Sequence, residues 1–147
     1  MSRKIARELA VLSVFEYGFY INSAEDILEN LFSEEFLRNV PEELSIVEGI
    51  ETQKDYIVQT VNGTIAHLEE LDEHIRSNAI GWSLDRISRI AVAILRTAIY
   101  EAKYAEEIPV RVAVNEAVEI AKKYDSPETV SFINGVLGGV LKEVGIE

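Results

Sequence analysis

Apolar residues recur every three or four positions along almost the whole chain, and this periodicity restricts the fold more than any other feature. Between residues 57 and 75 the apolar side chains are spaced by 4, 4, 3, 3 and 4 positions (Ile57, Val61, Ile65, Leu68, Leu71 and Ile75). An α-helix places such residues on one face, whereas a strand needs strict alternation. Alternation never lasts beyond a few residues, so we predict an all-α fold.

The same spacing divides the chain into six or seven predicted helices. Their apolar stripes run over residues 5–19, 27–36, 57–75, 87–99, 110–121 and 132–144, with an irregular connector over 39–51. The 87–99 stripe is the most apolar and is predicted to lie at the centre of the core. Ser23 and Ser126 are predicted N-caps, and Pro127 suits a first helical position. A length of 147 residues fits one compact helical bundle over residues 1–147.

The stretch SFINGVLGGVL, residues 131–141, combines a helical apolar pattern with an Asn-Gly pair that normally marks a hairpin turn. As a helix it carries Gly135, Gly138 and Gly139, each of which costs about 1 kcal/mol relative to alanine. We predict that these glycines form a flat strip against a neighbouring helix.

Charge is distributed unevenly. The net charge of −12 argues against a nucleic-acid ligand, because phosphate contacts need Lys and Arg. However, residues 22–80 hold 3 basic and 14 acidic residues, a net charge of −11, whereas residues 1–21 carry +1. The acidic residues are therefore concentrated in the middle of the chain, which leaves room for a basic patch elsewhere.

The sequence offers little for catalysis. It contains no cysteine, no phosphate-binding Gly-x-x-x-x-Gly-Lys motif and no evident nucleophile beside a base. His67 and His74 are two helical turns apart, which favours surface histidines over a metal site. We predict a protein that is not an enzyme and has no metal or cofactor. Absence of cysteine and of any long apolar stretch fits the cytoplasm rather than a membrane.

Two groups of basic residues remain as candidates for binding. Arg3, Lys4 and Arg7 lie on the first turns of a helix, and Arg3 and Arg7 share a face. They either bind phosphates or serve solubility and a local pair with Glu8. Arg86, Arg89 and Arg96 line one side of the apolar helix, where they either hold phosphates or form bidentate pairs with acidic neighbours.

Four stretches in order resemble the NusB family. They are RKIARELAVLSVFEYGF, WSLDRISRIAVAILRTAIYEAKY with its Ile-Leu-Arg-x-Ala-x-Tyr-Glu core, IPVRVAVNEAVEIAKKY and SFINGVL. Good matches cover about residues 3–20 and 82–141, while the acidic middle matches only in length and helicity. The resemblance implies a compact all-helical fold and a transcription antitermination factor. It also implies binding of single-stranded boxA RNA together with the ribosomal protein NusE, in an antitermination complex with RNA polymerase.

Carried over by position, the resemblance assigns site residues. The RNA-binding residues would be Arg3, Lys4, Arg7, Arg96, Asn115, Glu116 and Asn134, and the residues that contact the protein partner would be Arg89, Tyr100 and Glu128. Asn115, Glu116 and Asn134 could instead serve helix-to-helix hydrogen bonds and capping. Ala91 and Val92 stand where relatives commonly carry charged residues.

Two alternative functions belong to other classes. The chain could be a non-catalytic helical adaptor related to the N-terminal domain of ribosomal RNA cytosine methyltransferases, since it carries no methyltransferase unit of its own. It could also be a structural adaptor whose acidic face recruits a basic protein.

Overall fold

The computed structural model describes residues 1–18, 22–33, 35–36, 49–83 and 86–146. Within these ranges it contains seven α-helices, a short 3-10 helix and no strand, which confirms the predicted fold. The elements are α1 (Arg3–Tyr17), α2 (Ala24–Leu31), η2 (Ile50–Gln53), α4 (Lys54–Ala66), α5 (Leu68–Asn78), α6 (Arg89–Tyr104), α7 (Val110–Tyr124) and α8 (Pro127–Glu143). Phe19 and most of the predicted 39–51 connector lie outside the described residues. None of the described helices combines the length and the apolar character needed to cross a bilayer.

Serine side chains begin four of these helices. The hydroxyls of Ser2, Ser23, Ser88 and Ser126 each accept a hydrogen bond from the backbone N–H three residues later. Ser23 also forms the full capping box with Asp26, and Pro127 opens α8, as predicted. These caps satisfy N–H groups that have no partner inside the helix.

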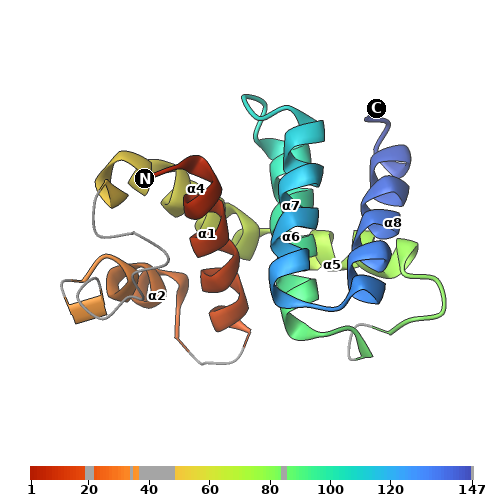
Figure 1. Ribbon diagram of the computed structural model, residues 1–147, viewed down its shortest axis with the longest axis horizontal. Coiled ribbons are helices and arrows are strands. Elements are labelled where there is room, and N and C mark those ends of the chain that lie inside the picture. Colours follow the sequence, from red (N-terminus) through yellow and green to blue (C-terminus); the bar gives the residue numbers. More distant parts are fainter. Residues whose placement is uncertain (19–21, 34, 37–48, 84–85, 147) are drawn as a thin grey trace.

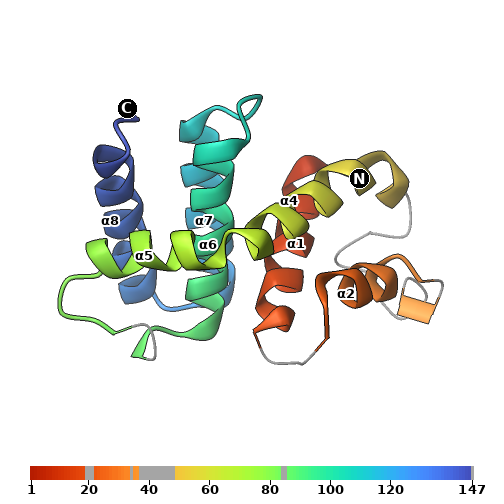
Figure 2. The same cartoon turned by 180° about the vertical axis from the view of Figure 1, so that it is seen from behind.

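The helices form two halves (Figure 1). One half contains α1, α2 and α4, while α6, α7 and α8 stand side by side in the other and α5 crosses them, as Figure 2 shows. The central position belongs to α6, which contacts α1, α4, α5, α7 and α8. Ten of its residues are buried, so the most apolar predicted stripe does lie at the centre of the core.

Helix α1 contributes to both halves of the core. Val11 and Val14 join the hydrophobic cluster around α6, whereas Ala6, Leu9 and Ala10 join the cluster shared with α2 and α4. The direction of α1 is therefore set by contacts on two sides, which also determines where its basic first turns lie.

The predicted helix over residues 57–75 is wrong in one respect, because it divides at His67 into α4 and α5. There the backbone has φ −112° and ψ 20°, and the His67 N–H donates to the Thr64 carbonyl at 3.2 Å. The His67 ring packs against Tyr104, with centroids 4.4 Å apart. Since α4 faces α1 and α5 faces α8, the chain must turn between them, although the apolar spacing continues without a break.

The predicted glycine strip of α8 is only partly correct. A Cβ on Gly139 would lie 2.3 Å from Oδ1 of Asn78, so this glycine does permit close packing with α5. Gly135 and Gly138 face open space, because no atom lies within 4 Å of a Cβ at either position. The tightest approach occurs elsewhere, at Gly63, where a Cβ would lie 2.2 Å from the Tyr100 ring.

These environments predict opposite effects for two alanine substitutions. Gly138→Ala should raise the free energy of unfolding by up to about 1 kcal/mol, because alanine is the better helix former and meets no neighbour. Gly63→Ala should lower it by about 1–3 kcal/mol, because Tyr100 must move. Urea denaturation followed by circular dichroism measures both, and equal effects of the two variants would contradict the packing described here.

Candidate nucleic-acid interface

The first turns of α1 carry the basic cluster that the sequence singles out. In the structure two of its three side chains are exposed and one is buried. Arg3 and Lys4 are exposed, whereas Arg7 is only 4% exposed. The cluster therefore presents two cations rather than three to a ligand at this end of α1.

Arg7 forms a buried ion pair with Glu101 of α6. Its Nε and Nη2 donate to the two carboxylate oxygens at 2.9 and 3.0 Å, and the Tyr56 hydroxyl of α4 donates to the same carboxylate at 3.0 Å. Three helices thus meet at one carboxylate. The RNA contact of Arg7 stays a prediction, and the structure gives it no support, because the guanidinium is enclosed and already committed to a bidentate partner.

The ionisation of this group follows from its burial. Desolvation opposes the charge of Arg7, but the hydrogen bonds and attraction of Glu101 outweigh it and hold the pKa of the guanidinium above its ordinary value. Burial, followed by the charge of Glu101, raises the pKa of the Tyr56 phenol far above its usual range. The Arg7 guanidinium therefore stays charged and the Tyr56 phenol stays protonated around neutral pH.

Arg3 and Lys4 remain on the surface above this group. Arg3 donates from Nε to the Gln53 side-chain oxygen at 2.8 Å, and its guanidinium carbon lies 4.1 Å from the centroid of the Tyr56 ring. These contacts hold the Arg3 side chain in place while leaving it exposed. The Lys4 ammonium has no ion pair or hydrogen bond with the rest of the described chain.

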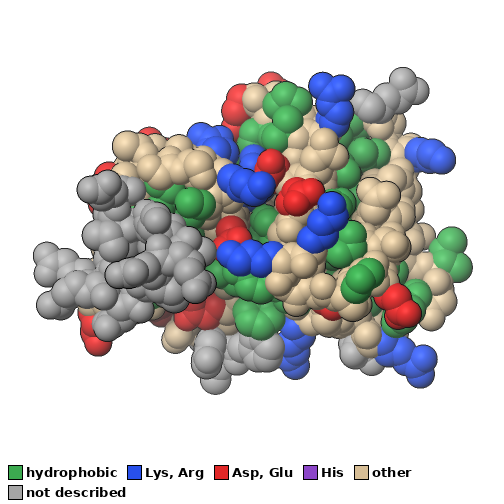
Figure 3. All heavy atoms as spheres, viewed as in Figure 1, with side chains coloured by type: hydrophobic (Ala, Val, Ile, Leu, Met, Phe, Trp, Pro, Cys, Tyr) green, Lys and Arg blue, Asp and Glu red, His purple; other side chains and the backbone are tan. Residues whose placement is uncertain are grey.

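One turn further along α1, the negative charge of Glu8 is balanced by a lysine of α7. Glu8 accepts hydrogen bonds from Lys123 at 2.9 Å and from the Tyr124 hydroxyl at 3.1 Å, so the end of α7 is joined to α1. Burial and then the Glu8 carboxylate raise the pKa of Tyr124 to about 12. Basic and acidic side chains consequently lie next to each other over α1 and α7 (Figure 3), and no continuous basic surface extends in this direction.

On α6 the arginine side chains have partners as well. Arg96 makes a bidentate pair with Asp72 of α5, at 2.7 and 2.8 Å, so the bidentate interpretation of this arginine is confirmed. Arg89 reaches the Gly18 carbonyl at the end of α1, at 3.4 Å. Both arginines and Phe15 line a surface pocket of about 400 Å³ between α1 and α6. Val92 lines the same pocket, and both Ala91 and Val92 are buried.

The remaining predicted site residues lie on α6, α7 and α8. Asn115 is exposed on α7, while Asn134 and Glu128 are exposed on α8. One Glu116 carboxylate oxygen is buried and has no hydrogen-bond partner in the described structure. Tyr100 is 7% exposed and packs on Gly63, where its ring fills the space between α4 and α6, so its contact with a protein partner stays a prediction that the structure does not support.

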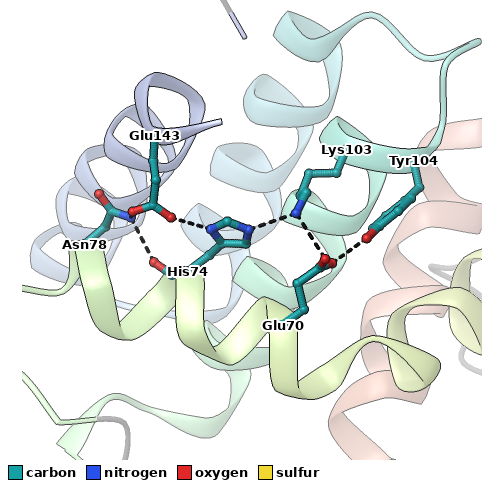
Figure 4. A network of polar contacts seen from close by, with 6 residues as sticks. All are labelled: Glu70, His74, Asn78, Lys103, Tyr104 and Glu143. Atoms are coloured by element: carbon teal, nitrogen blue, oxygen red, sulfur yellow. Dashed lines mark hydrogen bonds and ion pairs between the residues drawn. The ribbon is translucent and has the colours of Figure 1, made fainter. Parts of the chain in front are cut away.

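A chain of polar contacts joins α5, α6 and α8 (Figure 4). The Lys103 ammonium lies 2.9 Å from Nε2 of His74 and 3.3 Å from Glu70, and Nδ1 of His74 faces Glu143. Because an ammonium only donates, Nε2 accepts and Nδ1 carries the ring proton toward Glu143. His67 instead contacts the Gly63 carbonyl at 2.7 Å. Among the described residues no group of three potential ligands could hold a metal ion.

Nothing in the sequence alone marks Tyr56, Glu101 or Asp72 as partners of the predicted cations. Arg7 and Glu101 are 94 positions apart, and no local pattern links them. The one available signal was Glu101 itself, a charged residue in a largely apolar helix, since such a residue needs a partner when it is buried.

Comparisons with known proteins agree on one family. A family profile described as the NusB family matches residues 4–142. The transcription antitermination protein NusB of Thermoanaerobacter sp. (strain X514) is 42% identical over 147 residues, which cover 100% of this chain and 95% of that protein. Its counterpart in Clostridium botulinum (strain Hall) is 37% identical over 145 residues, covering 96% and 100% of the two chains.

Solved structures show the same fold. The NusB structure of T. maritima superimposes with a TM-score of 0.78 at 28% identity, covering 97% of this chain and 92% of that one. A crystal structure of the antitermination factors NusB and NusE in complex with dsRNA contains a chain that matches with a TM-score of 0.76 at 21% identity, covering 96% of each.

The buried ion pair predicts a large loss of stability on truncation. Arg7→Ala leaves the Glu101 carboxylate buried without its counter-ion, which should lower the free energy of unfolding by about 3–5 kcal/mol. Lys4→Ala, on the same turn but exposed, should change it by less than about 0.5 kcal/mol. Chemical denaturation measures both values, and a surface role for Arg7 would instead make the two variants alike.

The contacts of Glu143 predict a pH-dependent contribution to stability. The hydrogen bond from His74 lowers the pKa of the Glu143 carboxyl in the folded state. Its stabilising effect is therefore complete above the ordinary pKa and disappears as the pH falls through the lowered value. Glu143→Gln should reduce the free energy of unfolding near about pH 6, and by less near about pH 3, which lies below the ordinary pKa of a glutamate. Denaturation at both pH values tests this, and a pH-independent difference would contradict it.

Proposed function

Because the chain belongs to the NusB family, we propose that it is a transcription antitermination factor that binds boxA RNA together with the ribosomal protein NusE during ribosomal RNA transcription. In this proposal residues 1–147 act as one RNA-binding domain in the cytoplasm. The domain is part of the RNA polymerase antitermination complex, and its role is binding, not catalysis.

The observation that carries the proposal is the position of Arg3 and Lys4. Both are exposed on the first turn of α1, and the buried Arg7–Glu101 pair beneath them anchors that turn to α6. Arg3 is also held against Tyr56, so its guanidinium is partly ordered before RNA arrives. An ordered arginine loses less conformational entropy on binding a phosphate than a freely rotating one.

Further residues extend the proposed surfaces. Phe15 and Arg96 line the pocket next to α1, which suits an unpaired base, since the Arg96 guanidinium is already paired with Asp72. Arg89 on the same pocket and Glu128 at the start of α8 are proposed for the protein partner. Asn115, Glu116 and Asn134 stay predicted RNA contacts that depend on how far the strand extends beyond α1.

The charge of the chain explains why a protein partner is needed. With a net charge of −12 and two exposed cations at the proposed contact, electrostatic attraction to RNA is weak on its own. A partner adds contact area and its own phosphate contacts. A solved complex that holds NusB and NusE together with dsRNA supports a joint role of the two proteins.

Two substitutions test the RNA contact. Arg3→Ala and Lys4→Ala should each weaken boxA binding by about tenfold, the effect of losing one charge-assisted contact. Each should also make the slope of log affinity against log salt shallower by about 0.7. Fluorescence polarisation with labelled boxA RNA, in the presence and absence of NusE, gives both quantities.

The matched control is Lys54→Ala, which removes an exposed lysine from α4, where its ammonium lies over Phe32. It should leave affinity and salt slope unchanged. Scrambled RNA should bind less tightly than boxA, and NusE should increase the difference. If the chain bound NusE but no RNA, the structural adaptor would replace this proposal; if it bound neither, a methyltransferase-type adaptor would.

A further inference from the structure

The side chain of Gln53 reaches from the start of α4 to the exposed Arg3 on α1. Gln53 is half-buried, and its Oε1 accepts the hydrogen bond from Nε of Arg3 at 2.8 Å. Because an arginine only donates, the atom that faces Nε must be the amide oxygen. Gln53 immediately precedes α4, yet its side chain does not cap that helix. The amide is therefore used for Arg3 and not for its own helix.

The segment that carries Gln53 is itself fixed against α1. In Figures 1 and 2, η2 lies beside the start of α1, and Ile50 of η2 is 3% exposed in the same apolar cluster as Leu9. Gly49 has a φ of 82°, and a Cβ there would lie 2.5 Å from the backbone nitrogen of Met1. A side chain at this position would prevent so close an approach. The position of Gln53 follows from it.

Two contacts restrain the Arg3 guanidinium and leave its outer edge free. Gln53 holds Nε, and the guanidinium carbon lies 4.1 Å from the centroid of the Tyr56 ring. The hydrogen bond from the Tyr56 hydroxyl to Glu101 fixes that ring in turn. Neither Nη group of Arg3 has a hydrogen-bond partner in the ranges that the structure describes. Together the two Nη groups form a planar fork that matches two phosphate oxygens.

The acceptor that holds Arg3 is neutral, unlike the acceptors of several other arginines. Arg7, Arg76 and Arg96 each pair with a carboxylate, which balances the charge of the guanidinium. An amide oxygen orients a guanidinium without balancing its charge. Arg3 is therefore held in place and keeps its full attraction for an anion.

We propose that Gln53 is a positioning residue for RNA binding, whose amide oxygen holds Nε of Arg3 and thereby directs both Nη groups at one phosphate of the strand. This inference rests on the proposed function, in which Arg3 contacts RNA. Gln53 acts through Arg3 and does not itself touch the strand. An arginine that is ordered beforehand loses less conformational entropy on binding, and a neutral acceptor leaves its charge available for the phosphate.

Two substitutions of similar size separate orientation from charge. Gln53→Met removes the acceptor but leaves the charge of Arg3, so boxA affinity should fall by about threefold with an unchanged salt dependence. Gln53→Glu keeps an acceptor but balances the charge of Arg3. Affinity should then fall by about tenfold, and the slope of log affinity against log salt should become shallower by about 0.7. Fluorescence polarisation with labelled boxA RNA in the presence of NusE measures both quantities.

A double-mutant cycle tests whether Gln53 acts through Arg3. In the Arg3→Ala background, Gln53→Met should change boxA affinity by less than about 1.5-fold, because no guanidinium is left to orient. If Gln53→Met weakened binding equally in both backgrounds, the proposal would be overturned, since Gln53 would then contact RNA directly or act on the fold.

Two readouts without RNA separate positioning from a structural role. The Nε–H signal of Arg3 in NMR spectra at mildly acidic pH, assigned by its absence in Arg3→Ala, should exchange more slowly with water than in Gln53→Met. The urea midpoint of Gln53→Glu should equal or exceed that of the unmodified chain, because the variant gains an ion pair. A loss of RNA binding that followed a loss of stability would instead indicate a structural residue and overturn the proposal.

The matched controls are Gln59→Met and Gln59→Glu, the same changes at an exposed glutamine of α4. Both should leave affinity and salt dependence unchanged. If Arg3→Ala weakens boxA binding but neither Gln53 variant does, this inference fails while the proposed function stands. If Arg3→Ala has no effect, the proposed RNA contact on α1 fails, and the role of Gln53 fails with it.

Discussion

The buried ion pair between Arg7 and Glu101, completed by Tyr56, is the interaction on which the arrangement of the helices depends. Removing two charges from water is costly unless the geometry satisfies both, and here the carboxylate accepts three hydrogen bonds from two other helices. The pair lies where the two halves of the core meet. It therefore determines how α1 and α4 pack on α6. The position of the exposed Arg3 and Lys4 on α1 follows from that packing.

This pair also decides what α1 offers to a ligand. Three cations lie close together in the sequence, but one is used to hold the helix and two remain outside. Arg3 connects the two roles, because it stacks on the same Tyr56 that binds Glu101. The proposed RNA contact is thus small and ordered, which suits a factor that binds its RNA together with a partner protein.

Part of the acidic charge in the middle of the chain has a structural use as well. The run of residues 69–74 looks like a solvated helix face in the sequence. In the structure Asp72 pairs with Arg96, Glu70 meets Lys103, and His74 joins Glu143. These contacts attach α5 to α6 and α8, while Glu69 and Glu73 remain exposed. Net charge therefore overstates the repulsion that RNA would meet near α6.

Local pattern by itself determined the helices of this protein, several of their caps and the central place of α6, because helix periodicity and capping depend on residues three or four positions apart. It also determined the family, through four ordered motifs. Only the tertiary structure decided that Arg7 is buried, that Tyr100 fills the space over Gly63, that α4 and α5 separate at His67, and that two of three glycines in α8 face solvent. Each of these depends on which distant side chain lies opposite, and the spacing of residues along the sequence does not indicate such long-range contacts.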